Sequence, residues 1–237
     1  MRVPAFLGVA ALIAACSPAS ERPYRLPYAN GVEVEITADH TDHEKPPERM
    51  FDLRATQPDQ VLAAAAPGWV RAIEDGGDSS APTNNYLWIE HPLDYCQPAG
   101  GSAPGGLAGT CRNCPEGPGL CNEWTLYAHM REGSVRNAPP NGAGLEIGDW
   151  VGEGQAIGVE GDVGCLQFMP PCTRHLHFTV FVFEIDSLLS TPSTNGDYEE
   201  YADLHGRPER VPLFCTAAGL RLVRTGEEHV AGPCPPL

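Results

Sequence analysis

The sequence predicts an all-β fold. Short apolar runs alternate with polar residues at a period of two, which is typical of strands with one wet face. The 26 glycines and 24 prolines separate these runs as turns. No segment with a helical apolar period is long enough to predict a helix, and the sequence contains no repeat.

The first half of the predicted sheet consists of short strands. Residues 32–36 alternate cleanly between apolar and polar side chains and predict a strand. The polar, proline-containing residues 39–49 predict a loop, and residues 50–55 predict the next strand. The alanines of residues 61–66 would suit a helix, but a Pro-Gly pair stops it at once. We therefore expect a strand and turn there, leading into a strand over residues 69–73.

The second half is expected to centre on a hairpin with arms at residues 85–91 and 123–130. Between the arms, residues 96–121 are rich in glycine, proline and cysteine. Such a stretch cannot build an apolar core and would depend on its disulfides. Glycine turns divide residues 145–159 into short strands, and residues 175–184 form the last clear strand.

The N-terminus resembles the signal of a bacterial lipoprotein. Residues 3–15 are apolar but too few to span a bilayer, and they end in Ile-Ala-Ala-Cys. We expect a lipoprotein signal peptide over residues 1–15, a lipidated Cys16 and a tether over residues 16–30. The alternative is ordinary signal cleavage beside an incidental cysteine. An aspartate after the cysteine would indicate inner-membrane retention; Ser17 predicts anchoring in the outer membrane, at its periplasmic face.

The other eight of the nine cysteines predict up to four disulfides in an exported protein. Proximity in the sequence favours the pairs Cys165–Cys172 and Cys215–Cys234. The remaining four would bridge among themselves: Cys96, Cys111, Cys114 and Cys121. A zinc knuckle in this last group is the alternative, which export and the lack of a second CxxC pair disfavour.

The charge balance disfavours a nucleic-acid partner. Only 15 Lys+Arg stand against 31 Asp+Glu, giving a formal net charge of −16. The sequence has no basic cluster that would neutralise phosphates.

The segment Thr-Arg-His-Leu-His-Phe-Thr-Val, residues 173–180, predicts a metal site. In a strand, His175 and His177 point to one face, while Leu176 and Phe178 point to the other, packed face. Two imidazoles that converge on one point suit zinc chemistry, because one can bind the metal while the other moves protons. The alternative is a solvated His-x-His pair on an exposed strand.

Five segments, in order, resemble the lysostaphin/LytM-type zinc metallopeptidases: FDLRA, PGWVRAIEDGG, LYAHM, IGDWVGEGQAIGVEGDVG and HLHFTV. The resemblance implies an antiparallel β core with an open groove over residues 31–185, with residues 96–121 as an insertion and residues 186–237 as an extension packing on the domain. It implies a zinc-dependent endopeptidase that cuts peptide bonds in peptidoglycan stems or cross-links. Some members of the family have lost the zinc and only bind or activate partners such as a cell-wall amidase, which is the alternative function.

The same resemblance implies roles for individual residues. Asp52 in Phe-Asp-Leu matches the carboxylate zinc ligand, and His177 matches the late histidine ligand. His175 and His129, the latter in Tyr-Ala-His-Met, match the two catalytic histidines that do not bind the metal. His91 matches a common family position without a catalytic role, so we expect it to be structural.

Three features depart from the family pattern. The first zinc ligand is usually a histidine with three residues between it and the aspartate, whereas His43 has eight and His40 has eleven. Longer loops cost little extra closure entropy, so His43 is the expected ligand, with His40 and neither residue as alternatives. In addition, the loop before the histidine strand is longer than usual, and Thr173-Arg174 stands where a Gly-Pro or similar pair is common.

Overall fold

The computed structural model describes the protein over residues 23–42, 50–78, 84–91, 121–163, 173–184 and 209–234. Every regular element in these ranges is a β-strand, and the strands pair almost entirely antiparallel. The predicted all-β class is therefore confirmed. The described residues contain no helix long and apolar enough to cross a membrane.

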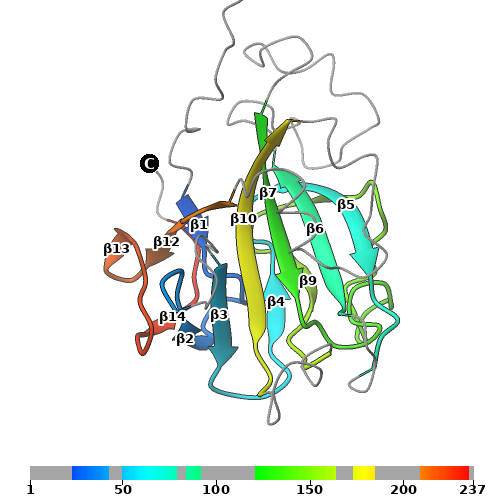
Figure 1. Cartoon of the computed structure of the whole chain (residues 1–237). Coiled ribbons are helices and arrows are strands. Elements are labelled where there is room, and N and C mark those ends of the chain that lie inside the picture. The colour runs from blue at the N-terminus through cyan, green and yellow to red at the C-terminus, as the bar shows by residue number, and fades with distance from the viewer. Residues whose placement is uncertain are drawn as a thin grey trace, which may run out of the picture.

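The main sheet has the strand order β14-β2-β3-β10-β7-β6-β5-β8, with β11 paired to β10. Figure 1 shows β10 running through the middle of this sheet, between β3 and β7. Two small sheets, β1-β12-β13 and β4-β9, complete the described structure. The strands are β1 (Pro23–Arg25), β2 (Glu33–Ala38), β3 (Met50–Ala55), β4 (Val61–Ala63), β5 (Gly68–Glu74), β6 (Tyr86–His91), β7 (Cys121–Ala128), β8 (Trp150–Val151), β9 (Ala156–Val159), β10 (Leu176–Glu184), β11 (Glu209–Arg210), β12 (Leu213–Thr216), β13 (Gly219–Arg221) and β14 (Glu228–Val230).

The N-terminal end of the fold differs from expectation. Residues 23–30 lie in the predicted tether, yet Tyr24, Leu26 and Tyr28 are fully buried in the core. Strand β1 pairs in parallel with β12, with Tyr24 opposite Phe214. The partner strand is nearly two hundred residues away, so no local alternation signals this pairing. The tether assignment is therefore wrong for residues 23–30. Likewise, β10 is not the last strand, because β11 to β14 follow it.

The core lies on one face of β10 and its neighbours. Leu176, Phe178 and Val180 of β10 are fully buried, as the period of two requires. Phe178 contacts Phe214 at a ring-centroid distance of 5.7 Å, and Phe214 contacts Phe51 at 5.3 Å. Burying a phenylalanine side chain contributes about 1.5–3 kcal/mol, so this group fixes β3 against β10 and the C-terminal extension.

The opposite face of the sheet carries a second apolar cluster. It contains Tyr86, Trp88, Trp124, Leu126, Ala128 and Phe181, each no more than 6 % exposed. The same face of β10 carries His177, four residues before Phe181. The histidines therefore stand at the end of an apolar surface rather than on a fully solvated one.

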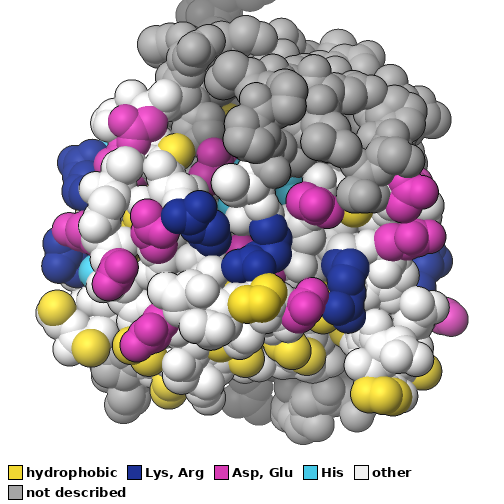
Figure 2. Space-filling view, turned by 90° about the horizontal axis from the view of Figure 1, so that it is seen from below, with side chains coloured by type: hydrophobic (Ala, Val, Ile, Leu, Met, Phe, Trp, Pro, Cys, Tyr) yellow, Lys and Arg dark blue, Asp and Glu magenta, His cyan; other side chains and the backbone are white. Residues whose placement is uncertain are grey.

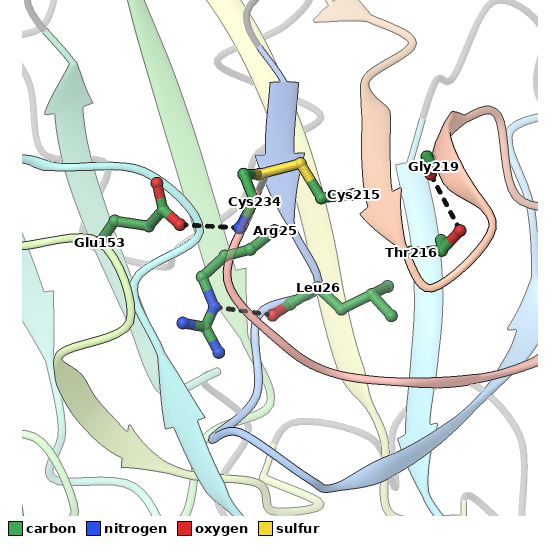
Figure 3. The surroundings of a disulfide bond; sticks show 7 residues. All are labelled: Arg25, Leu26, Glu153, Cys215, Thr216, Gly219 and Cys234. Atoms are coloured by element: carbon green, nitrogen blue, oxygen red, sulfur yellow. Dashed lines mark hydrogen bonds between the residues drawn. A yellow bond between two sulfur atoms is a disulfide. The ribbon is translucent and has the colours of Figure 1, made fainter. Parts of the chain in front are cut away.

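A disulfide fastens the C-terminal extension. Cys215 of β12 bonds to Cys234, with Cα atoms 5.2 Å apart (Figure 3). The Cys234 N–H donates to the Glu153 carboxylate at 3.3 Å, in the turn between β8 and β9. This confirms the predicted Cys215–Cys234 pair, whereas the side chains of the other predicted pairs lie outside the described residues.

Candidate metal centre

Strand register brings Asp52 and His177 together. In the antiparallel pairing of β3 with β10, these two residues stand directly opposite each other. Asp52 Oδ1 lies 3.3 Å from His177 Nδ1 and 3.7 Å from His175 Nε2. The expectation that both histidines face one side while Leu176 is buried is therefore correct. Ladder hydrogen bonds on both strands fix this geometry.

His129 joins the site from the neighbouring strand. It directly follows β7, where its φ of 63° places it in the left-handed region that non-glycine residues seldom adopt. The Asn84 side-chain oxygen accepts a hydrogen bond from the His129 N–H at 2.8 Å and holds this turn. The His129 ring centroid lies 4.6 Å from that of His175 and 5.8 Å from that of His177. We call Asp52, His129, His175 and His177 the histidine–aspartate cluster.

Backbone carbonyls fix the tautomers of two histidines. His129 Nδ1 lies 2.8 Å from the Val163 carbonyl, and His175 Nδ1 lies 2.7 Å from the Thr173 carbonyl. A carbonyl only accepts, so each Nδ1 carries the proton and each Nε2 is the acceptor nitrogen of the neutral ring.

The surroundings of His129 keep its imidazole neutral. Burial of the ring lowers its pKa to about 3, and the facing His175 and His177 act in the same direction. The Val163 carbonyl and Asp52 offset this lowering only in part. In the metal-free protein His129 is therefore uncharged throughout the neutral pH range, and its Nε2 is a hydrogen-bond acceptor.

The cluster brings enough donor atoms together to hold a metal ion. One nitrogen from each of His129, His175 and His177 lies within 4.8 Å of the others. Zinc ligands about 2.0–2.2 Å from the metal stand about 3.4 Å apart at the corners of a tetrahedron. The separation of 3.3 Å between Asp52 Oδ1 and His177 Nδ1 matches such an edge. Imidazole and carboxylate are also the donor types that zinc prefers among nitrogen and oxygen ligands.

The two candidates for the first zinc ligand, His43 and His40, differ in what the structure describes. His43 lies outside the described residues. His40 contacts Asp39, Arg224 and the Phe51 ring: its Nδ1 lies 3.7 Å from the Asp39 carboxylate and its Nε2 lies 3.4 Å from Arg224 Nη1. None of these three partners belongs to the histidine–aspartate cluster.

The structure adds supporting residues to which the sequence assigned no role. Asn84 and the Val163 carbonyl both orient His129, and neither was indicated by periodicity or by the resemblance to the metallopeptidases. His91 has the structural role expected of it. It is fully buried, and its two ring nitrogens contact the Pro67 carbonyl at 2.8 Å and the Thr125 hydroxyl at 2.7 Å.

The surface around the lower end of the sheet carries charges of both signs. Figure 2 views the molecule from below, and acidic and basic side chains are interspersed there, with histidine atoms visible near the centre of the face. Ion pairs among the described residues include Arg131 with Asp59 at 3.4 Å and Arg54 with Glu35 at 2.6 Å. The described part of this face has no continuous basic patch.

Comparison with known proteins shows that this chain is similar to several solved structures. No family model matches the chain, and no curated protein matches it. A zinc-containing peptidase from Vibrio cholerae is similar at 20 % identity and a TM-score of 0.39, covering 68 % of this chain and 37 % of its own. The M23 metalloprotease pseudoalterin from the deep sea is similar at 15 % identity and a TM-score of 0.39, covering 70 % and 72 %. Lysostaphin from Staphylococcus simulans is similar at 15 % identity and a TM-score of 0.35, covering 79 % and 56 %.

These similarities are low in identity and in TM-score, and the matched region spans little more than a third of the Vibrio peptidase. The assignment of a site therefore depends on the residues of this chain and on their geometry.

Proposed function

We propose that this protein is a zinc-dependent endopeptidase that hydrolyses peptide bonds in peptidoglycan stems or cross-links. The observation that carries the proposal is the convergence of Asp52 with three imidazoles, and above all the 3.3 Å between Asp52 Oδ1 and His177 Nδ1. The peptidoglycan substrate follows from the resemblance of the five sequence segments to the lysostaphin/LytM-type enzymes.

In this proposal Asp52 and His177 hold the zinc, with His43 as the third ligand. When bound, zinc lowers the pKa of a coordinated water to about 7 and polarises the scissile carbonyl. His175 and His129 present their Nε2 atoms, and one of the two takes up the proton of the attacking water. As imidazolium, either side chain then returns a proton to the leaving amine and stabilises negative charge on the carbonyl oxygen.

The test separates metal binding from proton transfer. His177→Ala removes a ligand and should abolish zinc binding together with cleavage of purified peptidoglycan. His175→Ala should keep stoichiometric zinc yet lose about 10²–10⁴ in rate, the usual worth of a proton-transfer group. Metal analysis and chromatography of the digest on the same samples measure both. Retained zinc and wild-type cleavage in both variants would show that the metallopeptidase proposal is wrong.

His40→Ala is the matched control for His43→Ala. Because His40 contacts Asp39, Arg224 and Phe51, its removal should leave zinc content unchanged, whereas His43→Ala should reduce it. If the wild-type protein holds no zinc and cuts nothing, but still binds peptidoglycan or an amidase, the inactive scaffold is the correct function.

We also propose that the protein is exported and anchored by a lipid on Cys16. The Cys215–Cys234 disulfide is typical of an oxidising compartment and supports export. Each buried methylene of an acyl chain contributes about 0.8 kcal/mol, so a multiply acylated cysteine would hold the protein firmly. Cys16→Ser should leave soluble or uncleaved protein, and membrane fractionation tests this. An unchanged membrane fraction for that variant would contradict lipidation.

A further inference from the structure

One buried carboxylate touches the strand that carries Asp52. Glu160 directly follows β9 and is only 1 % exposed. Its Oε1 accepts hydrogen bonds from the Ala55 N–H at 3.1 Å and from the Tyr28 hydroxyl at 3.0 Å. Ala55 is the last residue of β3, three positions after Asp52. Glu160 thus holds the end of the strand from which Asp52 projects.

The other oxygen of the same carboxylate holds the residue before His175. Glu160 Oε2 accepts a hydrogen bond from Arg174 Nε at 2.9 Å. Arg174 Nη2 in turn donates to the carbonyls of Ala55 at 2.9 Å and Gln57 at 3.2 Å. Arg174 lies between Thr173 and His175, and the Thr173 carbonyl is the acceptor that fixes the His175 tautomer. Anchoring Arg174 therefore anchors the backbone that aims the His175 ring.

The backbone at Glu160 also pairs with the segment that carries His129. Glu160 forms an isolated antiparallel bridge with Met130, the residue after His129. The carbonyl of the next residue, Gly161, accepts a hydrogen bond from the His175 N–H at 3.3 Å. Segments that carry Asp52, His175 and His129 therefore all meet at residues 160 and 161.

A second ion pair of similar burial provides a comparison for the Glu160–Arg174 pair. Arg71 and Glu90 lie 2.5 Å apart, with side chains 29 % and 5 % exposed. Arg174 and Glu160 have similar exposures of 26 % and 0 %. The Arg71–Glu90 pair, however, joins β5 to β6, and neither of these strands carries a member of the histidine–aspartate cluster. A buried ion pair is in itself weak evidence of stabilisation. The Glu160–Arg174 pair differs from the Arg71–Glu90 pair because it contacts the strand of Asp52 and the segment of His175.

We infer that Glu160 and Arg174 are positioning residues, which hold His175 and the Asp52 strand in the geometry that proton transfer requires. This inference deepens the proposed function and rests on it for the kinetic readout. Partners of this kind commonly matter about 10–100-fold for metal affinity or activity although they touch neither metal nor substrate. The resemblance to the metallopeptidases assigned no role to Glu160, and Arg174 stands at a departure from the family pattern.

Glu160→Gln is the most direct test of the inference, because it changes the hydrogen bonding of this side chain with little change in its shape. An amide has one acceptor oxygen where the carboxylate has two, so it must give up either the Ala55 N–H or the Arg174 guanidinium. Burial raises the pKa of the Glu160 carboxyl, because desolvation disfavours its charged form. Arg174→Lys is the second variant, because lysine lacks the planar fork that reaches both carbonyls and Glu160. Glu90→Gln is the matched control.

The experiment measures four quantities on the full chain: zinc content, melting temperature, kcat and KM on peptidoglycan peptides, and imidazole ¹⁵N shifts of the zinc-free protein. We expect Glu160→Gln and Arg174→Lys to lower kcat about tenfold or more with KM and zinc content little changed. The His175 shifts should move from a single Nδ1–H tautomer toward a mixture. Glu90→Gln should leave kcat and these shifts at wild-type values, even where its melting temperature falls as much.

Two results would overturn the inference. One is a kcat in both variants equal to that of Glu90→Gln at matched zinc content. The other is an unchanged His175 tautomer in zinc-free Glu160→Gln. The second readout does not depend on activity, so it decides the positioning role even if the wild-type protein cleaves nothing and the proposed function fails.

Discussion

Replacing Gly161 by alanine should separate the turn of His129 from the strand of His175. A Cβ at this position would lie 2.5 Å from the Arg131 nitrogen, and 2.8 Å from both the Arg131 Cα and the His129 carbonyl oxygen. All three are backbone atoms, so no side-chain rotation relieves the contact. The backbone on one side must therefore move.

The size of the movement follows from the contact distance. Favourable contacts between carbon atoms begin at about 3.5 Å, so the Arg131 nitrogen must retreat by roughly 0.5–1 Å. Overpacking of this kind costs about 1–3 kcal/mol of folding stability. A displacement of about 1 Å at a catalytic group can cost about 10² in rate. Asp52 and His177 stand on the ladder between β3 and β10, so zinc should remain bound.

Gly152→Ala is the control, because a Cβ there meets no atom within 4 Å. Both variants would be compared with the wild type for zinc content, melting temperature and cleavage rate. We expect Gly161→Ala to lose about tenfold to a hundredfold in kcat at full zinc occupancy, and Gly152→Ala to lose neither activity nor stability. Equal rates for the two variants would refute the idea that turnover requires the turn at His129 and the segment at His175 to keep their relative positions.

Two further predictions concern stability. Replacing both Cys215 and Cys234 by alanine opens a bridge with a sequence separation of 19 and should lower the free energy of unfolding by about 3 kcal/mol; thermal or urea unfolding measures this, and an unchanged midpoint would contradict it. The pKa of His129, lowered to about 3 against about 6.5 in the unfolded chain, means that the unfolded state binds the extra proton between these values. Zinc-free protein should therefore lose stability as the pH falls from about 6.5 toward about 3, and His129→Gln should show a shallower decline; equal slopes in the two proteins would contradict the assignment.

The sequence predicted those parts of the fold that depend on local alternation. Strand β3 was predicted with its observed bounds because buried side chains alternate with partly exposed ones, and β10 was predicted within one residue of its start although residues on both of its faces are buried. The pairing of β1 with β12 was missed, since Tyr24 is buried by Phe214 and its neighbours far along the chain. Periodicity reports which residues are buried within a strand, and it carries no information on which distant strand covers them.

In the candidate site, too, the sequence predicted local features and missed contacts between distant segments. A period of two predicts that His175 and His177 share a face, and the resemblance to the metallopeptidases names Asp52 and His129 as their partners. The left-handed conformation of His129, held by Asn84, depends on a contact across 45 residues that no spacing reveals. The link from Glu160 to Arg174 is likewise set by contacts between segments that follow β9 and precede β10, although Arg174 already stood out as a departure from the family pattern.

The two halves of the cluster are fixed by different physical means, and this has a functional consequence. Asp52 and His177 sit inside strands, where ladder hydrogen bonds on both sides set their separation. His129 and His175 sit just outside strand ends, where single carbonyls orient their rings. Strand interiors open only with the sheet as a whole, whereas strand ends fray locally. Metal affinity should therefore follow global stability, while turnover should also respond to local changes at residues 160–163 and 173–175 that leave the metal in place.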